Sequence, residues 1–263
     1  MGEWFFNLSV AWMALVIFLA TYLIAGSIGF VVATLAVNER AKSFKAVSPG
    51  VLPPLGILFA LLVGFIAVEV WGNFAKAKTA VETEASALRA VVLLAGVFPD
   101  EQSMSIYALV NRHIDESVNK EWPEMAHQRA TLAALPTALI EALHETLALK
   151  PADDSQRAAQ LEMVKEIHTA LDARRQRIVI SESALGTVKW VGILLQGLCT
   201  LVAIAMVHSD NRLARAISLA LFATGIAMSV LLIAAYGRPF SGEISVGPEL
   251  LKQVIASEVG FGG

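Results

Sequence analysis

Charged residues and cysteine are both scarce in this chain of 263 residues. Asp, Glu, Lys and Arg make up 16% of it and hydrophobic residues 56%, whereas soluble domains carry about 25% charged residues. A single cysteine, Cys199, leaves no partner for a disulfide framework and no thiolate metal cluster. The net charge of −3 does not suggest a nucleic-acid partner. The low charge content points away from a soluble protein.

Enzyme signatures are also missing from the sequence. His144-Glu145 lacks the second histidine of a zinc-protease helix, and the histidines show no pairing at helical spacing. No Gly-rich phosphate loop follows a strand, and no nucleophile elbow is present. We therefore expect no enzymatic activity, no catalytic residue, no bound metal and no cofactor.

The sparse charges leave four long charge-free runs, at residues 4–38, 46–68, 190–209 and 216–237. Each run reaches or exceeds the roughly 20 residues that a helix needs to cross a bilayer. The leader before the first run, Met1 to Leu8, has no Lys or Arg, so that run is expected to be a span and not a cleavable signal peptide. The sequence thus predicts four transmembrane helices.

Most of the charges lie between spans 2 and 3, in residues 74–183. Apolar residues recur there at three- and four-residue spacing, as in Ile106, Val110 and Ile114, which is typical of amphipathic helices in a bundle. No alternating strand pattern of useful length is present. The expected fold is all-α, with transmembrane hairpins at 1–73 and 184–237, a helical extramembrane domain at 74–183 and an amphipathic tail at 238–263.

Span 2 is expected from about Leu55 to Trp71. Ser48-Pro49-Gly50 and Pro53-Pro54 predict a polar loop and a helix start before it. Between Val70 and Val97 only two glycines interrupt the helical pattern, and each costs about 1 kcal/mol relative to alanine. The helix is therefore predicted to continue from the membrane into the extramembrane domain.

One ridge of span 2 is the main candidate site. Ile57, Leu61, Phe65 and Glu69 follow one another at steps of four, so they lie along one side of the helix. Such a ridge can line a pore as an apolar constriction with an acidic ring at its mouth, or it can pack against other helices. Glu69 is either a functional carboxylate at membrane depth or a solvated one at the headgroup level.

Two further charges are candidates for structural contacts. Glu84 lies on the apolar face of its helix, where a buried contact is expected, and Arg89 is a possible partner. Arg238 directly follows span 4 and precedes Pro239. Its guanidinium is expected to cap the last carbonyls of the span, to pair with an acidic group such as Glu84, or to extend to the membrane interface.

Three motifs resemble those of a bacterial membrane protein family described as bestrophin-like. The run Val81 to Leu88 resembles its "v..Ea.al" motif, Glu121-Trp122-Pro123 its "EWP" motif, and Arg238 to Gly242 its "RPFxG" motif. The order of the motifs and the arrangement of spans also agree. The resemblance implies structural roles for the motif residues Glu84, Trp122, Pro123, Arg238, Pro239, Phe240 and Gly242.

The resemblance also implies a function, because bestrophins are oligomeric, usually pentameric, anion channels whose second span lines a hydrophobic neck. With Gly64-Phe65 as the anchor, Ile57, Leu61 and Phe65 would form that neck. Glu69 departs from the pattern, since an acidic ring favours cations. The expected partners are the lipid bilayer, small inorganic ions and further copies of the chain. The alternative is a non-conducting scaffold or signalling protein whose helical domain binds a partner.

The orientation in the membrane is left open by the charges. Lys and Arg residues near the ends of the spans divide almost equally between the two sides, so the positive-inside rule does not choose between them. The resemblance favours the bacterial inner membrane, with the termini and the helical domain in the cytoplasm.

Overall fold

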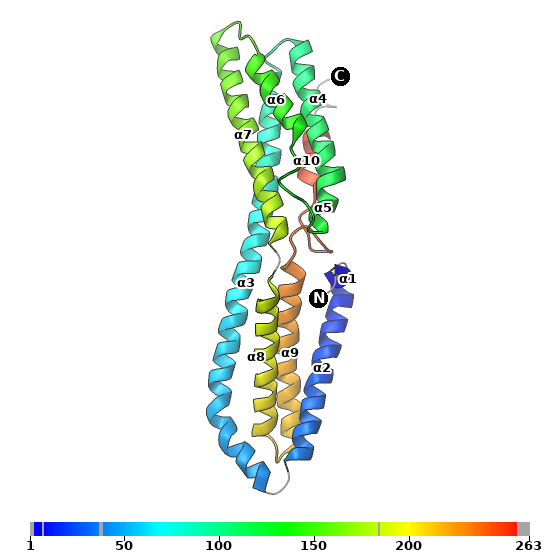
Figure 1. The fold of residues 1–263 in the computed structure, drawn as a ribbon, viewed down its shortest axis with the longest axis vertical. Coiled ribbons are helices and arrows are strands. Elements are labelled where there is room, and N and C mark those ends of the chain that lie inside the picture. Colours follow the sequence, from blue (N-terminus) through cyan, green and yellow to red (C-terminus); the bar gives the residue numbers. More distant parts are fainter. Residues whose placement is uncertain (1–2, 7, 37–38, 184, 257–263) are drawn as a thin grey trace. The chain divides into compact units, whose positions relative to one another are not determined.

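The structure is a computed structural model that describes residues 3–6, 8–36, 39–183 and 185–256. These residues are almost entirely helical and contain no strand (Figure 1). In chain order the helices are α1 (Glu3–Phe6), α2 (Val10–Leu35), α3 (Glu39–Ala95), α4 (Asp100–Glu116), the π-helical turn η1 (Ser117–Glu121), α5 (Trp122–Ala126), α6 (Thr137–Ala148), α7 (Asp154–Glu182), α8 (Thr187–Val207), α9 (Arg212–Tyr236) and α10 (Glu249–Ala256).

Two compact units divide the chain. The first, which we call the membrane unit, comprises Met1–Gly72, Ala184–Gly237 and Gly242–Ile244. The second, the extramembrane unit, comprises Asn73–Ser183, Arg238–Ser241 and Ser245–Gly263, of which residues 257–263 lie outside the described part.

Among the described residues, four helices are long and apolar enough to cross a membrane: α2, a part of α3 within Gly50–Ala95, α8 and α9. The prediction of four spans is thus confirmed. α9 packs against both α2 and α8, and Phe59 of α3 stacks near Phe222 of α9 with ring centroids 5.7 Å apart. The turn between α8 and α9 ends at Asn211, whose side chain caps α9 by accepting a hydrogen bond from the Ala214 amide.

Helix α3 is continuous through the end of span 2, as the sequence predicts, and ends only at Ala95. The predicted loop before the span is wrong, however. The helix already begins at Glu39 and includes Pro53 and Pro54. Proline removes one backbone donor and bends a helix without having to end it, and such residues are tolerated in membrane helices.

The extramembrane unit is a helical bundle built on the second part of α3. Leu88 and Val91 of α3 pack with Ile114 of α4, Leu139 of α6 and Ile167 of α7, all fully buried. Each helix turns an apolar stripe inward, and burial of such side chains contributes about 1.5–3 kcal/mol each. The stripes bring the motif residues of distant segments into one core.

Helix α7 begins directly after Asp153. The side chain of Asp153 accepts a hydrogen bond from the Gln156 amide at 2.8 Å and so caps the first turn. In α10, Leu251 and Val254 are buried in the same core. This helix of the predicted amphipathic tail is therefore part of the bundle.

Candidate functional site

The outward ridge of span 2 consists of Ile57, Leu61 and Phe65, whose side chains are 61%, 52% and 72% exposed. Phe59 and Ile66 of the same helix are buried and lie on the opposite face at helical spacing. The chain's own helices therefore cover one side of span 2 and leave this ridge uncovered.

Span 2 is also the least covered of the four membrane helices. In its most apolar 18-residue window 11% of the residues are buried, against 22% in α2 and 39% in α8 and in α9. A membrane helix with so little intramolecular contact is available for lipid, for another copy of the chain or for a pore. The spacing of the ridge left open that it packs against other helices of the same chain. The exposed fractions of Ile57, Leu61 and Phe65 do not support that alternative.

Glu69 continues the ridge and forms an ion pair with Lys189, in the first turn of α8. Both side chains are 43% exposed. The sequence around Glu69 gives no sign of Lys189, because the two residues are 120 positions apart in the chain. Glu69 alone would place a net negative charge at this end of the ridge. The Glu69–Lys189 pair carries no net charge and leaves only a dipole.

A second cluster of polar side chains lies in the extramembrane unit around Glu84, which is fully buried. Arg177 of α7 holds its carboxylate with two hydrogen bonds, Nε to Oε2 at 2.8 Å and an Nη to Oε1 at 3.0 Å. His113 of α4 lies 3.1 Å from Oε1. The expected burial of Glu84 is confirmed, and its guanidinium partner is Arg177, where the sequence suggested Arg89 or Arg238.

Glu121 links the cluster to the π-helical turn. Its Oε2 accepts a hydrogen bond from Arg177 at 3.0 Å, and its Oε1 accepts one from Arg174 at 2.7 Å. Two arginines and two glutamates thus balance one another, as a buried charge group must to avoid a large desolvation cost.

The EWP and RPFxG motifs meet at Trp122. The Arg177 guanidinium lies 4.4 Å from the centre of its indole ring, a cation–π contact. The indole N–H donates to the carbonyl of Val246 at 3.1 Å, and Phe240 packs edge-on at 6.0 Å. In the turn that follows, the carbonyl of the motif residue Pro239 accepts a hydrogen bond from the Val246 amide at 2.7 Å.

The motif residues Pro123 and Gly242 both bear on the backbone. Pro123 is the second residue of α5, which continues from η1 without leaving the helical conformation, so proline removes one backbone donor next to the π-helical turn. Gly242 has φ +83°, and a Cβ there would come within 2.8 Å of the Phe6 carbonyl. A side chain at position 242 would therefore be strained and would clash.

The charged neighbours of Glu84 shift its pKa. Burial alone raises the pKa of Glu84, but the positive charge of Arg177 and the hydrogen bond from His113 outweigh it and lower the pKa from 4.5 to about 2. Burial likewise lowers the pKa of Arg177, and Glu84 and Glu121 more than restore it. Among the described residues no group of three His, Cys, Asp or Glu could hold a metal. The hydrogen bonds of the cluster join α3, α4, η1 and α7.

The lowered pKa of Glu84 predicts a loss of stability in acid. Between pH 4.5 and about 2 the unfolded chain binds a proton at this position and the folded chain does not. The stabilisation is therefore complete above this window and is lost as the pH falls through it, by about 3 kcal/mol in total. Thermal unfolding of the detergent-solubilised protein, followed by circular dichroism from pH 5 to pH 3, measures it. An equally steep pH dependence in Glu84→Gln would contradict the assignment.

Comparisons with known proteins agree with this architecture. A variant of a bacterial bestrophin homologue from Klebsiella pneumoniae superimposes with a TM-score of 0.71 at 13% identity, over 95% of this chain and 99% of that one. A crystal structure described only as a membrane protein variant gives 0.70 at 14% identity, over 95% and 98%. The TM-scores show a shared fold, which the low sequence identities alone would not show. No curated protein matches the sequence.

Sequence similarity to a family extends over nearly the whole chain. Residues 10–251 match the Bestrophin-like domain, a range that includes all four spans and the helices between them. The resemblance carried by the three motifs is thereby confirmed, and the chain belongs to the bestrophin-like family of membrane proteins.

Proposed function

We propose that several copies of this chain assemble around an axis to form an ion channel, with span 2 of each copy facing the axis. The observation that carries the proposal is the outward ridge of Ile57, Leu61 and Phe65, which is apolar, continuous and uncovered on the least buried span. Channel activity is also what membership of the bestrophin-like family suggests.

Apolar rings of this kind can close a pore by dewetting, and charged rings select the sign of the permeant ion. In the proposed assembly Ile57, Leu61 and Phe65 form the constriction and Glu69 lies at one mouth. Since Lys189 pairs with Glu69, each copy adds one charge of each sign there. The mouth is then poorly selective, and its preference depends on which partner faces the ions.

Charge neutralisation at the two partners tests this arrangement. Glu69→Gln leaves Lys189 unpaired and should shift the reversal potential toward that of anions, whereas Lys189→Gln should shift it toward that of cations. In a tenfold salt gradient, the reversal potentials of an ideally anion-selective pore and of an ideally cation-selective pore each lie about 59 mV from zero, with opposite signs. Planar-bilayer recordings of the purified protein measure both shifts.

A matched control is Lys252→Gln, because Lys252 is an exposed lysine of α10 in the extramembrane unit. It should leave the reversal potential unchanged. Shifts of the same sign in Glu69→Gln and Lys189→Gln would contradict the proposed mouth.

The assembly itself is tested by mass. Each chain weighs 28.1 kDa, and a pentamer, the state suggested by the family, would weigh five times as much. Light scattering in detergent, corrected for bound detergent, distinguishes this from a monomer. A monomer, or an oligomer in which cysteines introduced at position 61 do not approach one another, would rule out a pore along span 2.

A further inference from the structure

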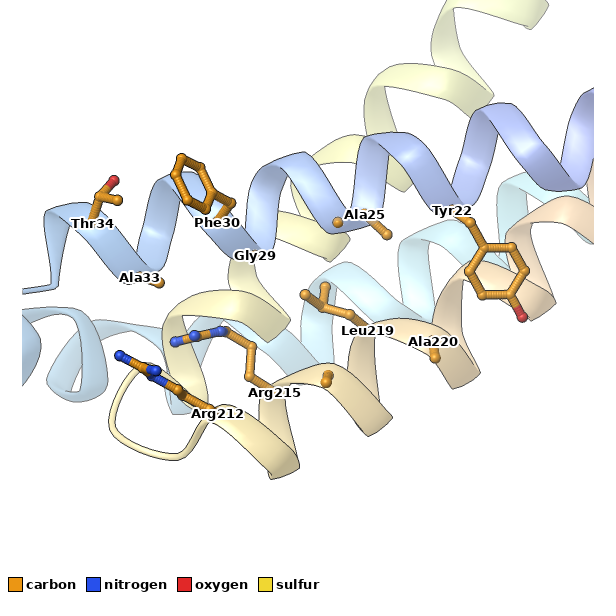
Figure 2. A pocket seen from close by; sticks show the side chains of 12 residues that line it. Tyr22, Ala25, Gly29, Phe30, Ala33, Thr34, Arg212, Arg215, Leu219 and Ala220 are labelled. Carbon is orange, nitrogen blue, oxygen red and sulfur yellow. The ribbon is translucent and has the colours of Figure 1, made fainter.

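A second site lies within the membrane unit, in a cavity of about 570 Å³ between α2 and α9. Small residues create the space: Ala25, Gly26, Gly29 and Ala33 on α2 face Ala216 and Ala220 on α9. Figure 2 shows the two helices along the cavity, with Phe30 and Leu219 adding apolar walls. A space of this size within a membrane helix bundle is large enough for part of an amphiphile.

The two ends of the cavity differ in chemistry. At one end the hydroxyls of Tyr22 and Thr224 are hydrogen-bonded at 2.7 Å. At the other end Arg212 and Arg215 lie near Thr34 (Figure 2). From Tyr22 to Thr34 the helix rises about 18 Å, which is close to the ~15 Å depth of one leaflet.

Arg215 is the most informative residue of the cavity because it is a charged group only 7% exposed. A guanidinium has five N–H donors, and the described residues give Arg215 one acceptor, the Ser209 carbonyl at 3.1 Å. No ion pair joins Arg215 or Arg212 to a carboxylate of the described chain, and Arg212 is exposed at the same end. Arg215 lies in the first turn of α9, just before the charge-free run of span 4, and a buried charge there needs a counter-charge.

We propose that the cavity binds an anionic phospholipid, with its phosphate on Arg212 and Arg215 and one acyl chain along Gly26 and Gly29. Guanidinium groups bind phosphate oxygens with paired, charge-assisted hydrogen bonds, which would satisfy the remaining donors of Arg215. The apolar walls match a hydrocarbon chain, and the depth of the cavity matches one leaflet. The site is independent of the proposed pore.

Lipid retention measured by native mass spectrometry tests the proposal. Delipidated protein is titrated with phosphatidylglycerol or with phosphatidylcholine of the same acyl chains. The wild type should retain phosphatidylglycerol more tightly, and Arg212→Gln should weaken that retention about fivefold, as one basic residue contributes about 1 kcal/mol to anionic-lipid binding. The matched control is Arg40→Gln, an exposed arginine of α3 that does not line the cavity, and it should change nothing.

The acyl-chain part of the site is tested separately with Gly26→Leu. A Cβ at position 26 meets nothing within 4 Å, so leucine can fill the cavity without distorting α2, and the variant should fold while losing most of its phosphatidylglycerol. Inorganic phosphate should not compete at concentrations similar to those of the lipid. Equal retention of both lipids, equal effects of Arg212→Gln and Arg40→Gln, or undiminished binding in Gly26→Leu would each overturn the proposal.

Discussion

Replacement of Glu84 by glutamine is expected to destabilise the protein by about 3–5 kcal/mol, because it leaves the fully buried guanidinium of Arg177 without its main counter-charge. Glutamine keeps the shape of the side chain and removes only the charge. For a unit of this size the loss lowers the unfolding temperature by on the order of 10 °C. Scanning calorimetry or circular dichroism in detergent measures it.

Glu82 provides a matched control two residues away on the same helix. It pairs with Lys78 at 3.8 Å, and the two side chains are 48% and 64% exposed. Glu82→Gln should therefore cost at most about 0.5 kcal/mol. Similar losses in the two variants would show that burial of the charge is not what matters at Glu84.

A double variant separates the cost of an unpaired charge from the value of the pair. Glu84→Leu combined with Arg177→Met removes both charges and fills a similar volume, and buried ion pairs replaced in this way often leave stability unchanged or improved. Glu121 keeps Arg174 as its partner. We expect the double variant to be clearly more stable than Glu84→Gln. If it is less stable, the pair itself stabilises the fold.

Truncation of Phe65 is expected to increase ion leak on the order of tenfold by widening and wetting the proposed constriction. Phe65 is 72% exposed on the outward ridge, so its replacement by alanine removes little packing within the chain and should leave folding intact. Flux from liposomes loaded with a salt-sensitive dye measures the leak.

Leu221→Ala is the control for Phe65→Ala, because Leu221 is an equally exposed apolar residue, at 71%, on α9. It should not change the flux. If neither the wild type nor Phe65→Ala conducts although both are folded, the non-conducting scaffold becomes the better interpretation. Equal leak from both alanine variants would mean that the effect is not specific to span 2.

The spans and the bundle were predictable because both depend on local composition. A charge-free run long enough to cross the bilayer defines a membrane helix wherever it occurs, and α2, α8 and α9 lie within or close to such runs. The start of α3 was not predictable in this way. Whether Pro53 and Pro54 end a helix or only bend it depends on the partners that the freed carbonyls find, and those come from outside the segment.

The partners of the charges were the part that local reasoning could not supply. Glu84 is 93 positions from Arg177, and Glu69 is 120 positions from Lys189, so each pair depends on how two helices pack. One pattern in α7 could have indicated Arg177. Its buried residues Met163, Ile167 and Ala170 recur at spacings of four and three, and the same rhythm leads to Arg174 and Arg177. Arginines on an apolar stripe require buried carboxylates.

The π-helical turn η1 changes the side of the helix on which the residues after it lie. The Trp122 amide donates to the Ser117 carbonyl, five residues back, so Trp122 stacks above Ser117 where a regular helix would place the fourth residue. In a helix of uniform pitch, Trp122 would lie about 100° from its present position around the helix axis, and its indole would point away from Arg177. A homologous chain one residue shorter between positions 117 and 122 could therefore keep both flanking faces in phase. The same deletion inside α4 would rotate every later side chain by about 100°.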